Sequence, residues 1–263
     1  MMIEVINLEK SYGPKPALID VNLTINPGDI YVLVGPNGAG KTTTLKCIYG
    51  DLKPDDGEIL IFGKKLNKFR KRNISVLLED KVTFKGLYPY DYAELWKILY
   101  PNWNDKKYKE LMMEFKLPIN KPVHAFSSGM KTLFYIILMF SSRPKIMILD
   151  EPTQNIDPVK KDKILKMLKD FVSNKENIVI MSTHHIEEVE LIATNFAIIN
   201  AGKTTFEGNI EKALSEHKIV KQSEMTEEME IITPLDEGIL VKTDENIGRN
   251  PDFREVVLGY LKK

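Results

Sequence analysis

Short apolar runs and amphipathic segments alternate along most of the chain. Residues 1–34 contain three apolar runs, IEVINL, ALIDVNLTI and DIYVLVG, which predict antiparallel strands with a turn at NPGD. Residues 73–80, 145–150 and 177–183 are each apolar at their centre, and KIMILD at 145–150 is typical of a strand buried on both faces. KPDDGEILIFG predicts a turn and a strand, and NFAIINAGKTTFEG predicts two strands joined at Ala-Gly.

Helices are predicted between these strands. One begins at Lys41 and stops at Gly50, a residue type that commonly ends helices. Residues 86–140 are rich in aromatic side chains and mostly helical in pattern, and Asn104 is a suitable N-cap there. One face of the helix after Asn104 carries large side chains at helical spacing, namely Tyr108, Leu111, Met112 and Phe115. Residues 159–172 predict a further helix with Val159, Ile164, Leu168 and Phe171 roughly in line.

Strands that alternate with helices indicate an α/β fold with a mainly parallel sheet and helices on its faces. Ligands bind such sheets at the carboxyl ends of the strands. Polar or phosphate-binding residues follow four of the apolar runs: GPNGAGKT after YVLV, Glu79 after SVLL, Asp150 and Glu151 after IMIL, and His184 after VIMST. We expect these four strand ends to converge on one site.

The predicted domain boundary lies where the alternation of strands and helices ends. Residues 1–210 are predicted to form the main domain, with a helical subdomain at about 86–140. After residue 210 the chain is charged and less regular, with a short helix expected in DFREVVLGYLKK. We expect residues 211–263 to form a small C-terminal region that serves as an accessory element, a dimer contact or a regulatory tail.

Composition narrows the classes of function. Lysine plus arginine equals aspartate plus glutamate, 37 each, which argues against binding nucleic acid through a basic face. The one cysteine, Cys47, excludes an internal disulfide and a cysteine-based metal site, and fits a reducing cytosol. The N-terminal residues do not resemble a signal peptide, and the longest apolar run, 133–140, is shorter than the roughly 20 residues of a spanning helix. The sequence thus predicts a soluble chain that can attach to a membrane protein.

GPNGAGKT, residues 35–42, matches the phosphate-binding pattern G-x-x-x-x-G-K-[ST] between a strand and a helix. Its glycines let backbone N–H groups approach phosphates, while Lys41 adds a positive charge and the Thr42 hydroxyl can ligate Mg²⁺. Asp150 ends a buried strand, where a carboxylate can hold Mg²⁺ through water. Glu151 is then placed to act on an attacking water as a general base. The alternative for Asp-Glu-Pro is a plain strand end at a turn.

His184 is a candidate for orienting that water or for sensing the γ-phosphate. A lone histidine at a strand end is more often structural, but its place on the same sheet edge favours a functional role. No such positional argument applies to His185, which is interpreted as a surface or packing residue.

The motifs together resemble those of the ATP-binding cassette (ABC) ATPases, over residues 2 to about 210. GPNGAGKTT is similar to the Walker A motif, IMILDE to Walker B with its catalytic glutamate, and FSSGMK at 126–131 to the signature sequence. NID at 155–157 resembles the D-loop, and STHH places His184 at the switch histidine. The resemblance implies a P-loop NTPase (RecA-like) fold with an antiparallel β subdomain and an inserted helical subdomain.

The resemblance also implies ATP and Mg²⁺ as cofactors and gives residues their roles. It assigns the catalytic roles to Glu151, His184 and Lys41, and Mg²⁺ to Thr42, Asp150 and Glu79. Glu79 falls at the Q-loop, and Tyr12 falls where the family stacks an aromatic ring on adenine. The nucleotide-binding residues expected in this way are Tyr12, Gly35, Asn37, Gly38, Gly40, Lys41, Thr42, Thr43, Glu79, Ser127, Gly129 and Asp157.

The signature segment implies a second chain. FSSGMK precedes an apolar run that predicts a buried helix, and serine and glycine at a helix start suit an anion. In this family two cassettes face each other head to tail, so Ser127 and Gly129 would bind the ATP held by the partner's Walker A loop. A working site would need two cassettes, either two copies of this chain or this chain and a different one.

Several positions depart from the common family pattern. Ser128 and Met130 replace a glycine and a glutamine of the signature, and S-x-G-M is common in the ABC-2-type subgroup that powers bacterial exporters. Glu79 in place of glutamine is also common in that subgroup. Asn155 replaces the usual D-loop glycine and bears on the coupling between the two sites. Asp157, followed by proline, also suits a helix N-cap.

Residues 87–103 hold six aromatic side chains, which either fill the core of the helical subdomain or form a docking surface. By resemblance, the groove between this segment and Glu79 receives a short cytoplasmic helix of a membrane permease. YPNW is similar to an element of a branch linked to export of antimicrobial or amphipathic peptides. The basic cluster at 64–72 is interpreted as a solvated hairpin edge rather than as a surface for anionic lipids.

The predicted function is an ATP-binding and ATP-hydrolysing subunit that energises export through a separate membrane permease, at the inner face of the cell membrane. One alternative is a soluble cassette protein acting on ribosomes or DNA, but such chains usually hold two cassettes or a long coiled-coil insert. The other is a non-hydrolysing regulatory cassette, which Glu151 and His184 argue against and which Asn155 and Glu79 leave open. No nucleic-acid partner is expected.

Overall fold

A nine-stranded mixed sheet forms the centre of the computed structural model, which describes residues 2–65 and 71–263. The basic cluster predicted at residues 64–72 falls largely on residues 66–70, outside the described residues. The strands are β1 (Ile3–Tyr12), β2 (Lys15–Ile25), β3 (Ile30–Val34), β4 (Asp56–Ile61), β5 (Ile74–Leu77), β6 (Ile146–Asp150), β7 (Ile178–Thr183), β8 (Asn195–Asn200) and β9 (Lys203–Gly208). Their order across the sheet is β4-β1-β2-β9-β8-β3-β7-β6-β5.

The centre of this sheet is parallel, and its β1 side is antiparallel. β8, β3, β7, β6 and β5 pair in parallel in that order, whereas β1 pairs antiparallel with β2 and β4. The prediction that the third apolar run joins the antiparallel group is wrong, because β3 pairs in parallel with β7 and β8. All five residues of β3 are buried, and a strand that is apolar on both faces fits only where helices cover both sides of the sheet.

Helices on both faces cover the parallel strands. The helices of this part of the chain are α1 (Lys41–Ile48), α3 (Pro89–Leu99), α4 (Asp105–Glu114), α5 (Ser128–Ser142), α6 (Pro158–Val172) and α7 (Ile186–Ile192), of which α3 and α4 pack on α5 rather than on the strands. The side chains of β3 alternate between two apolar cores. Val32 and Val34 pack in the core shared with α5, α6 and α7, whereas Tyr31 and Leu33 pack in the core shared with α1. This arrangement confirms the predicted α/β fold class.

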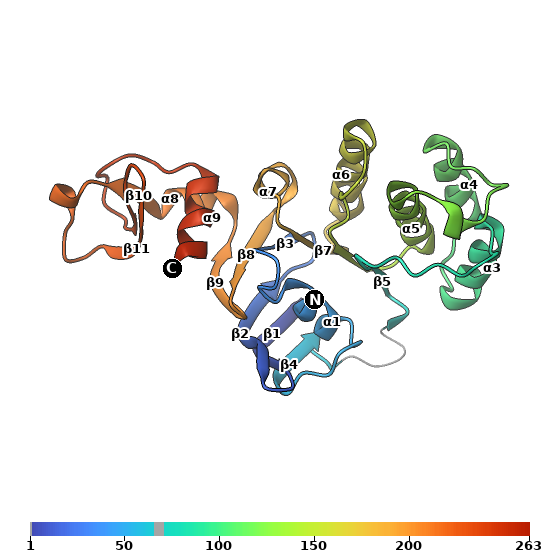
Figure 1. Ribbon diagram of the computed structural model, residues 1–263, viewed down its shortest axis with the longest axis horizontal. Coiled ribbons are helices and arrows are strands. Elements are labelled where there is room, and N and C mark those ends of the chain that lie inside the picture. The colour runs from blue at the N-terminus through green and yellow to red at the C-terminus, as the bar shows by residue number, and fades with distance from the viewer. Residues whose placement is uncertain (1, 66–70) are drawn as a thin grey trace.

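Helices α3, α4 and α5 lie between β5 and β6 in the sequence and at one end of the long axis in Figure 1. The predicted N-cap at Asn104 is confirmed, because its Oδ1 accepts a hydrogen bond from the Lys107 backbone N–H at 3.1 Å. The predicted apolar face is buried at Tyr108, Leu111, Met112 and Phe115. None of the helices described is long and apolar enough to cross a membrane.

The aromatic side chains of residues 87–103 were expected either to fill a core or to form a docking surface, and the structure shows some of them buried and some exposed. Tyr92 is fully buried, and its ring meets that of Phe134 edge-on at 5.4 Å between centroids. Tyr90 is 68% exposed on the same helix. The segment therefore fills a core on one side and presents aromatic surface on the other.

The helix predicted over 159–172 is α6, with one error in its buried face. Ile164 and Leu168 are fully buried, but Val159 is exposed. Val159 lies in the first turn, two residues after the N-cap Asp157, whose Oδ1 accepts a hydrogen bond from the Lys160 backbone N–H at 3.1 Å. The capped first turn of α6 extends beyond the core into solvent. Helical periodicity alone therefore predicts burial for Val159 where the structure shows exposure.

The C-terminal residues form a small unit whose regularity the sequence pattern did not indicate. Its elements are α8 (Ile210–Ser215), β10 (His217–Val220), β11 (Glu230–Leu235), β12 (Gly238–Lys242) and α9 (Phe253–Lys262). The strands form an antiparallel sheet of order β10-β12-β11. The short final helix is confirmed as α9, but the expectation of a less regular segment is wrong for the three strands. They are short and carry charged residues between the apolar ones, which obscures their alternation.

Helix α9 attaches this unit to the main sheet. The ring of Phe253 meets that of Phe196 on β8 edge-on at 5.0 Å, and the side-chain amide of Asn200 donates to the Leu261 carbonyl at 3.0 Å. Phe253 belongs to the same apolar core as β3, α6 and α7. The C-terminal unit lies at the end of the molecule opposite α3 and α4 (Figure 1).

His217 is fully buried where α8, β10 and α9 meet. Its Nδ1 lies 2.7 Å from the Ala213 carbonyl oxygen, and its Nε2 lies 3.0 Å from the Tyr260 hydroxyl. Burial lowers the pKa of His217 below its usual value, although the hydrogen bond to Ala213 opposes this in part. The native state therefore favours the neutral imidazole.

We expect the stability supplied by His217 to be lost as the pH falls through the ordinary histidine pKa of about 6.5, since the unfolded chain then binds a proton that the native chain does not. Urea unfolding at pH 7.5 and 5.5 measures this. His217→Gln should lose less free energy of unfolding over that interval than the wild type, while His124→Gln, at an exposed histidine, should behave as the wild type does. Equal losses in all three proteins would contradict the assignment.

Candidate active site

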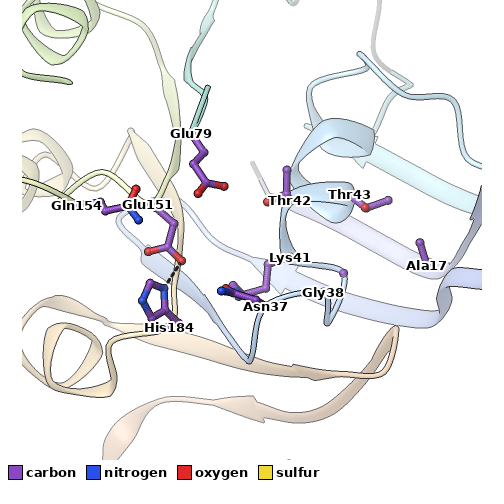
Figure 2. A pocket seen from close by; sticks show the side chains of 11 residues that line it. Ala17, Asn37, Gly38, Lys41, Thr42, Thr43, Glu79, Glu151, Gln154 and His184 are labelled. Carbon is purple, nitrogen blue, oxygen red and sulfur yellow. Dashed lines mark hydrogen bonds and ion pairs between the residues drawn. The ribbon is translucent and has the colours of Figure 1, made fainter. Parts of the chain in front are cut away.

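A cavity of about 320 Å³ lies at the carboxyl ends of the parallel strands. Figure 2 shows Glu79, Glu151 and His184 on one side of it and Asn37, Lys41 and Thr42 on the other. It is lined by Ala17, Asn37, Gly38, Gly40, Lys41, Thr42, Thr43, Glu79, Glu151, Gln154 and His184. The polar residues that follow β3, β5, β6 and β7 thus meet at one place.

The glycines between β3 and α1 are needed for two different reasons. A Cβ on Gly35 would lie 2.2 Å from the Ile199 carbonyl oxygen, and one on Gly40 would lie 2.7 Å from a methyl group of Leu18. These two glycines let the loop pack against the rest of the fold. Gly38 has open space around it, and its φ of 81° is one that residues with a Cβ rarely adopt. Gly38 thus allows the loop to curve around the cavity.

The amino end of α1 opens into this cavity without a side-chain cap. Gly40 is the N-cap, and the first turn of α1 contains no acidic residue. The first N–H groups of a helix lack partners within the helix and carry the positive end of its dipole. With Thr42 and Thr43 on that turn, this end of α1 suits a phosphate group.

Lys41 lies in the first turn of α1 and is folded back on the loop. Its Nζ donates to the Gly35 carbonyl at 2.7 Å and to the Pro36 carbonyl at 3.1 Å. Burial lowers the pKa of Lys41, and the negative charges of Glu151 and, to a lesser extent, Asp150 oppose the shift. The amine is therefore held beside the cavity on neutral oxygens, which an anionic oxygen can replace.

Asp150, the last residue of β6, is buried just behind the cavity. Its Oδ1 accepts a short hydrogen bond from the Ser182 hydroxyl on β7. This bond fixes the carboxylate and joins the ends of the two strands.

Glu151 turns back into the cavity because its backbone adopts a left-handed conformation, with φ of 48°. The residue is 6% exposed, and its Oε1 lies 2.8 Å from His184 Nδ1. The other oxygen, Oε2, is buried and has no hydrogen-bond partner among the described residues. A buried carboxylate oxygen without a donor is available to accept a proton or to ligate a cation.

A buried carboxylate that the sequence analysis did not single out supports the same loops. Glu188 on α7 is 3% exposed and accepts from the Thr153 hydroxyl at 2.6 Å and from Lys161 Nζ at 2.6 Å. Thr153 follows Glu151 by two residues, and Lys161 lies on α6. Glu188 thereby ties the loop after β6 to both helices. In the sequence, the only indication of this role for Glu188 was an acidic residue on the apolar side of a short helix.

Six predicted site residues are not part of the cavity lining; besides Gly35 and Asp150, described above, they are Tyr12, Ser127, Gly129 and Asp157. Tyr12 ends β1 and is 52% exposed, and Asp157 caps α6. Ser127 caps α5, its Oγ accepting from the Met130 backbone N–H at 3.3 Å, and Gly129 lies in the first turn of that helix. Within one chain the structure does not bring these four residues to the lining of the cavity.

Gly129 and Asn155 touch through their backbones. A Cβ on Gly129 would lie 2.3 Å from the Asn155 carbonyl oxygen, so only glycine permits this approach. Asn155 itself has a φ of 62°, a region that glycine adopts freely and asparagine tolerates. The asparagine thus suits the conformation of the position at which it replaces glycine.

The lining includes two residues that the sequence analysis did not name. Gln154 lies three residues after Glu151, and its position in the predicted D-loop region was the available signal. Ala17 on β2 lies close to the phosphate-binding loop, since a Cβ on Gly40 would lie only 2.9 Å from the Ala17 carbonyl oxygen. A lone alanine in the sequence does not indicate such a contact.

A sequence model of the family described as "ABC transporter" matches residues 18–154, which hold the phosphate loop, the signature segment and Glu151. The chain belongs to the ABC transporter family. The predicted resemblance is thereby confirmed, and the cassette is an ATP-binding domain.

Curated relatives agree with this assignment. The cassette is 30% identical over 211 residues to the ABC transporter ATP-binding protein YtrB of Bacillus subtilis, covering 78% of this chain and 70% of that protein. It is 34% identical over 210 residues to the lantibiotic transport ATP-binding protein SrtF of Streptococcus pyogenes, covering 78% and 90%. It is 30% identical over 209 residues to the bacitracin transport ATP-binding protein BcrA of Bacillus licheniformis, covering 77% and 68%.

Solved structures show the same fold. The ATP-binding subunit of an ABC transporter matches with a TM-score of 0.74 at 27% identity, covering 81% of this chain and 92% of that one. A dimeric bacterial ABC transporter cassette matches with a TM-score of 0.71 at 26% identity, covering 79% and 98%. The predicted cassette fold is confirmed.

We expect Glu188→Gln to lower the free energy of unfolding by about 1–3 kcal/mol, because it leaves Lys161 without its buried partner. Urea unfolding measures the change. Glu190→Gln, at an exposed position on the same helix, is the matched control and should shift stability by less than about 0.5 kcal/mol. The same small effect in both variants would show that Glu188 does not hold these loops.

Proposed function

We propose that this cassette binds Mg-ATP, hydrolyses it to ADP and phosphate, and energises export through a separate membrane permease. The observation that carries the proposal is the meeting of Lys41, Thr42, Glu79, Glu151 and His184 in one cavity at the amino end of α1. A cation, an uncapped helix start and carboxylates around one space are what phosphoryl transfer to water requires.

The residues at the cavity fit a magnesium ion as well as phosphates. Thr42, Asp150 and Glu79 offer hydroxyl and carboxylate oxygens, the donor type that Mg²⁺ prefers. Ser182 engages one oxygen of Asp150, which orients the carboxylate. When bound, Mg²⁺ neutralises charge on the phosphate oxygens.

Glu151 is proposed as the general base. Its Oε2 is buried without a partner, so it can take a proton from a water that attacks the γ-phosphate. His184 holds the other carboxylate oxygen at 2.8 Å and thereby sets the direction of Oε2. Lys41, released from the Gly35 and Pro36 carbonyls, would hold the phosphate oxygens.

A second cassette is proposed to complete the site. Ser127 is exposed at the amino end of α5, and Asp157 is exposed at the amino end of α6. Neither side chain lines the cavity of its own chain, which supports the expectation that the signature and D-loop segments serve the ATP of a partner cassette. Tyr12 remains the proposed adenine contact.

A groove between the Glu79 segment and the helical region is proposed to receive the permease. It has a volume of about 230 Å³ and a mainly apolar lining that includes Leu78, Val82, Phe84, Trp96 and Tyr135. Val82 and Phe84 are 73% and 57% exposed, which suits an apolar partner helix. The permease would place the cassette at the inner face of the cell membrane.

The relatives support export of antimicrobial or amphipathic peptides as the role. SrtF and BcrA are named for lantibiotic transport and bacitracin transport. These names and the balanced charge favour a transporter subunit over a cassette that acts on ribosomes or DNA. The base proposed at Glu151 favours hydrolysis over a purely regulatory role.

We expect Glu151→Gln to keep ATP binding and to lower the hydrolysis rate at least about 100-fold, because the amide cannot accept a proton. Phosphate release gives the rate, and titration with ATP gives the affinity. Glu187→Gln, at an exposed glutamate near the site, should hydrolyse ATP at the wild-type rate. Undiminished hydrolysis by Glu151→Gln would refute the proposed base.

We expect a pull-down of Glu151→Gln with Mg-ATP from detergent-solubilised membranes to recover a multi-span membrane protein. Mass spectrometry identifies the protein recovered. Adding Val82→Asp should remove that protein by placing a charge in the apolar groove. Adding Ile119→Asp, at a residue equally exposed at 73%, should not. Ribosomal proteins or nucleic acid in place of a membrane protein would overturn the transport role.

A further inference from the structure

One carboxylate and two imidazoles gather where β6 and β7 end. Glu151, His184 and His185 each offer one ligand atom, and these atoms lie within 4.8 Å of one another. His185 has no part in the proposed hydrolysis, and its sequence position alone carried no functional argument. Its proximity to the other two side chains is new information from the structure.

The backbone fixes His185 beside His184. The His185 backbone N–H donates to the Thr183 hydroxyl at 3.0 Å, and its carbonyl accepts from the Glu188 N–H at 3.1 Å. The two imidazole rings lie 4.0 Å apart between centroids, with 38° between their planes. Neighbouring residues thus present two ring nitrogens on the same side of the chain.

Glu151 supplies the observation that points to a ligand. The residue is 6% exposed, and its Oε2 has no hydrogen-bond partner among the described residues. An ionised carboxylate oxygen in that state is stabilised by a cation. Its other oxygen already contacts His184 Nδ1, so the carboxylate and that imidazole are held within coordinating reach of one ion.

We propose that Glu151, His184 and His185 bind a transition-metal ion of the zinc class, at a site separate from the oxygen ligands proposed for Mg²⁺. Imidazole and carboxylate together suit Zn²⁺ and Co²⁺, whereas Mg²⁺ prefers oxygen ligands alone. Ligands 2.0–2.1 Å from a tetrahedral ion lie about 3.3 Å apart, so small side-chain rotations suffice to close the cluster. His184 is 36% exposed, which leaves a fourth position for water.

The ion would inhibit the cassette. A metal-bound Glu151 carboxylate no longer accepts a proton, and a metal-bound His184 no longer orients it. The ion does not contact Lys41 or the amino end of α1, so the phosphate-binding loop stays available for ATP. This regulatory consequence rests on the proposed hydrolytic function, whereas binding of the metal does not.

Binding is tested on the nucleotide-free protein with Co²⁺, whose visible absorption reports coordination by nitrogen and oxygen ligands. We expect one Co²⁺ per chain, displaced by Zn²⁺ and not by Mg²⁺. His185→Gln should weaken binding at least about tenfold. His124→Gln is the matched control at the other exposed histidine and should bind as the wild type does. No saturable Co²⁺ spectrum in the wild type, or the same spectrum and affinity in His185→Gln, would overturn the site.

Inhibition is tested by phosphate release with Mg-ATP at free Zn²⁺ concentrations fixed by a metal buffer. Zn²⁺ should stop hydrolysis by the wild type and by His124→Gln, and a zinc-selective chelator should restore it. His185→Gln should need at least about tenfold more free Zn²⁺. Saturated metal binding with unchanged hydrolysis would overturn the inhibitory role. A protein that never hydrolyses ATP yet binds Co²⁺ through His185 would refute the proposed function and leave the metal site supported.

Discussion

The junction between the ends of β6 and β7 is the contact on which the site depends. The Ser182 hydroxyl of β7 donates to Asp150 of β6, and the backbone N–H of Glu151 lies 3.3 Å from both the carbonyl oxygen and the hydroxyl oxygen of Ser182. This junction fixes one carboxylate behind the cavity and makes the chain turn at the next residue. Without the left-handed turn, strand alternation would send Glu151 to the opposite face from the cavity. Two adjacent acidic residues thereby gain different environments, one bound to a hydroxyl and the other open to the cavity.

The segment after β5, the strand that pairs with β6, connects the cavity with the helical end of the molecule. Glu79 lines the cavity, and Val82, three residues later, lines the apolar groove beside α3 and α5. The Tyr135 hydroxyl donates to the Val82 carbonyl, and Lys81 Nζ donates to the Glu79 carbonyl at 2.9 Å. The Tyr135 bond holds this segment at its groove end, and only two residues separate Val82 from Glu79, so a displacement of Val82 would be passed on to Glu79. This geometry places the proposed permease surface three residues from Glu79, a proposed Mg²⁺ ligand at the cavity.

The sequence predicted which side chains meet at the cavity better than it predicted strand pairing. Phosphate-loop chemistry and strand ends are local patterns, so Lys41, Glu151 and His184 could be identified from short windows of sequence. The parallel pairing of β3 depends on strands that are about 150 residues away in the chain, and no local pattern reports it. The C-terminal strands were missed for a related reason: their burial comes from α9 and from each other rather than from long apolar runs. Glu188 was missed because only its partners, Thr153 and Lys161, show that its charge is buried and paired.

The signature helix and the loop that carries Glu151 form one mechanical unit within the chain. Gly129 packs against the Asn155 carbonyl so closely that no side chain fits between them. Asn155 follows Glu151 by four residues, and Thr153 between them is anchored to Glu188. A force applied to the exposed Ser127 at the start of α5 would therefore act on the same loop that positions Glu151, the proposed general base. In the proposed head-to-tail dimer the signature of one chain would meet the ATP of the other. This packing would then let each bound ATP influence the loop that carries Glu151 in the opposite chain.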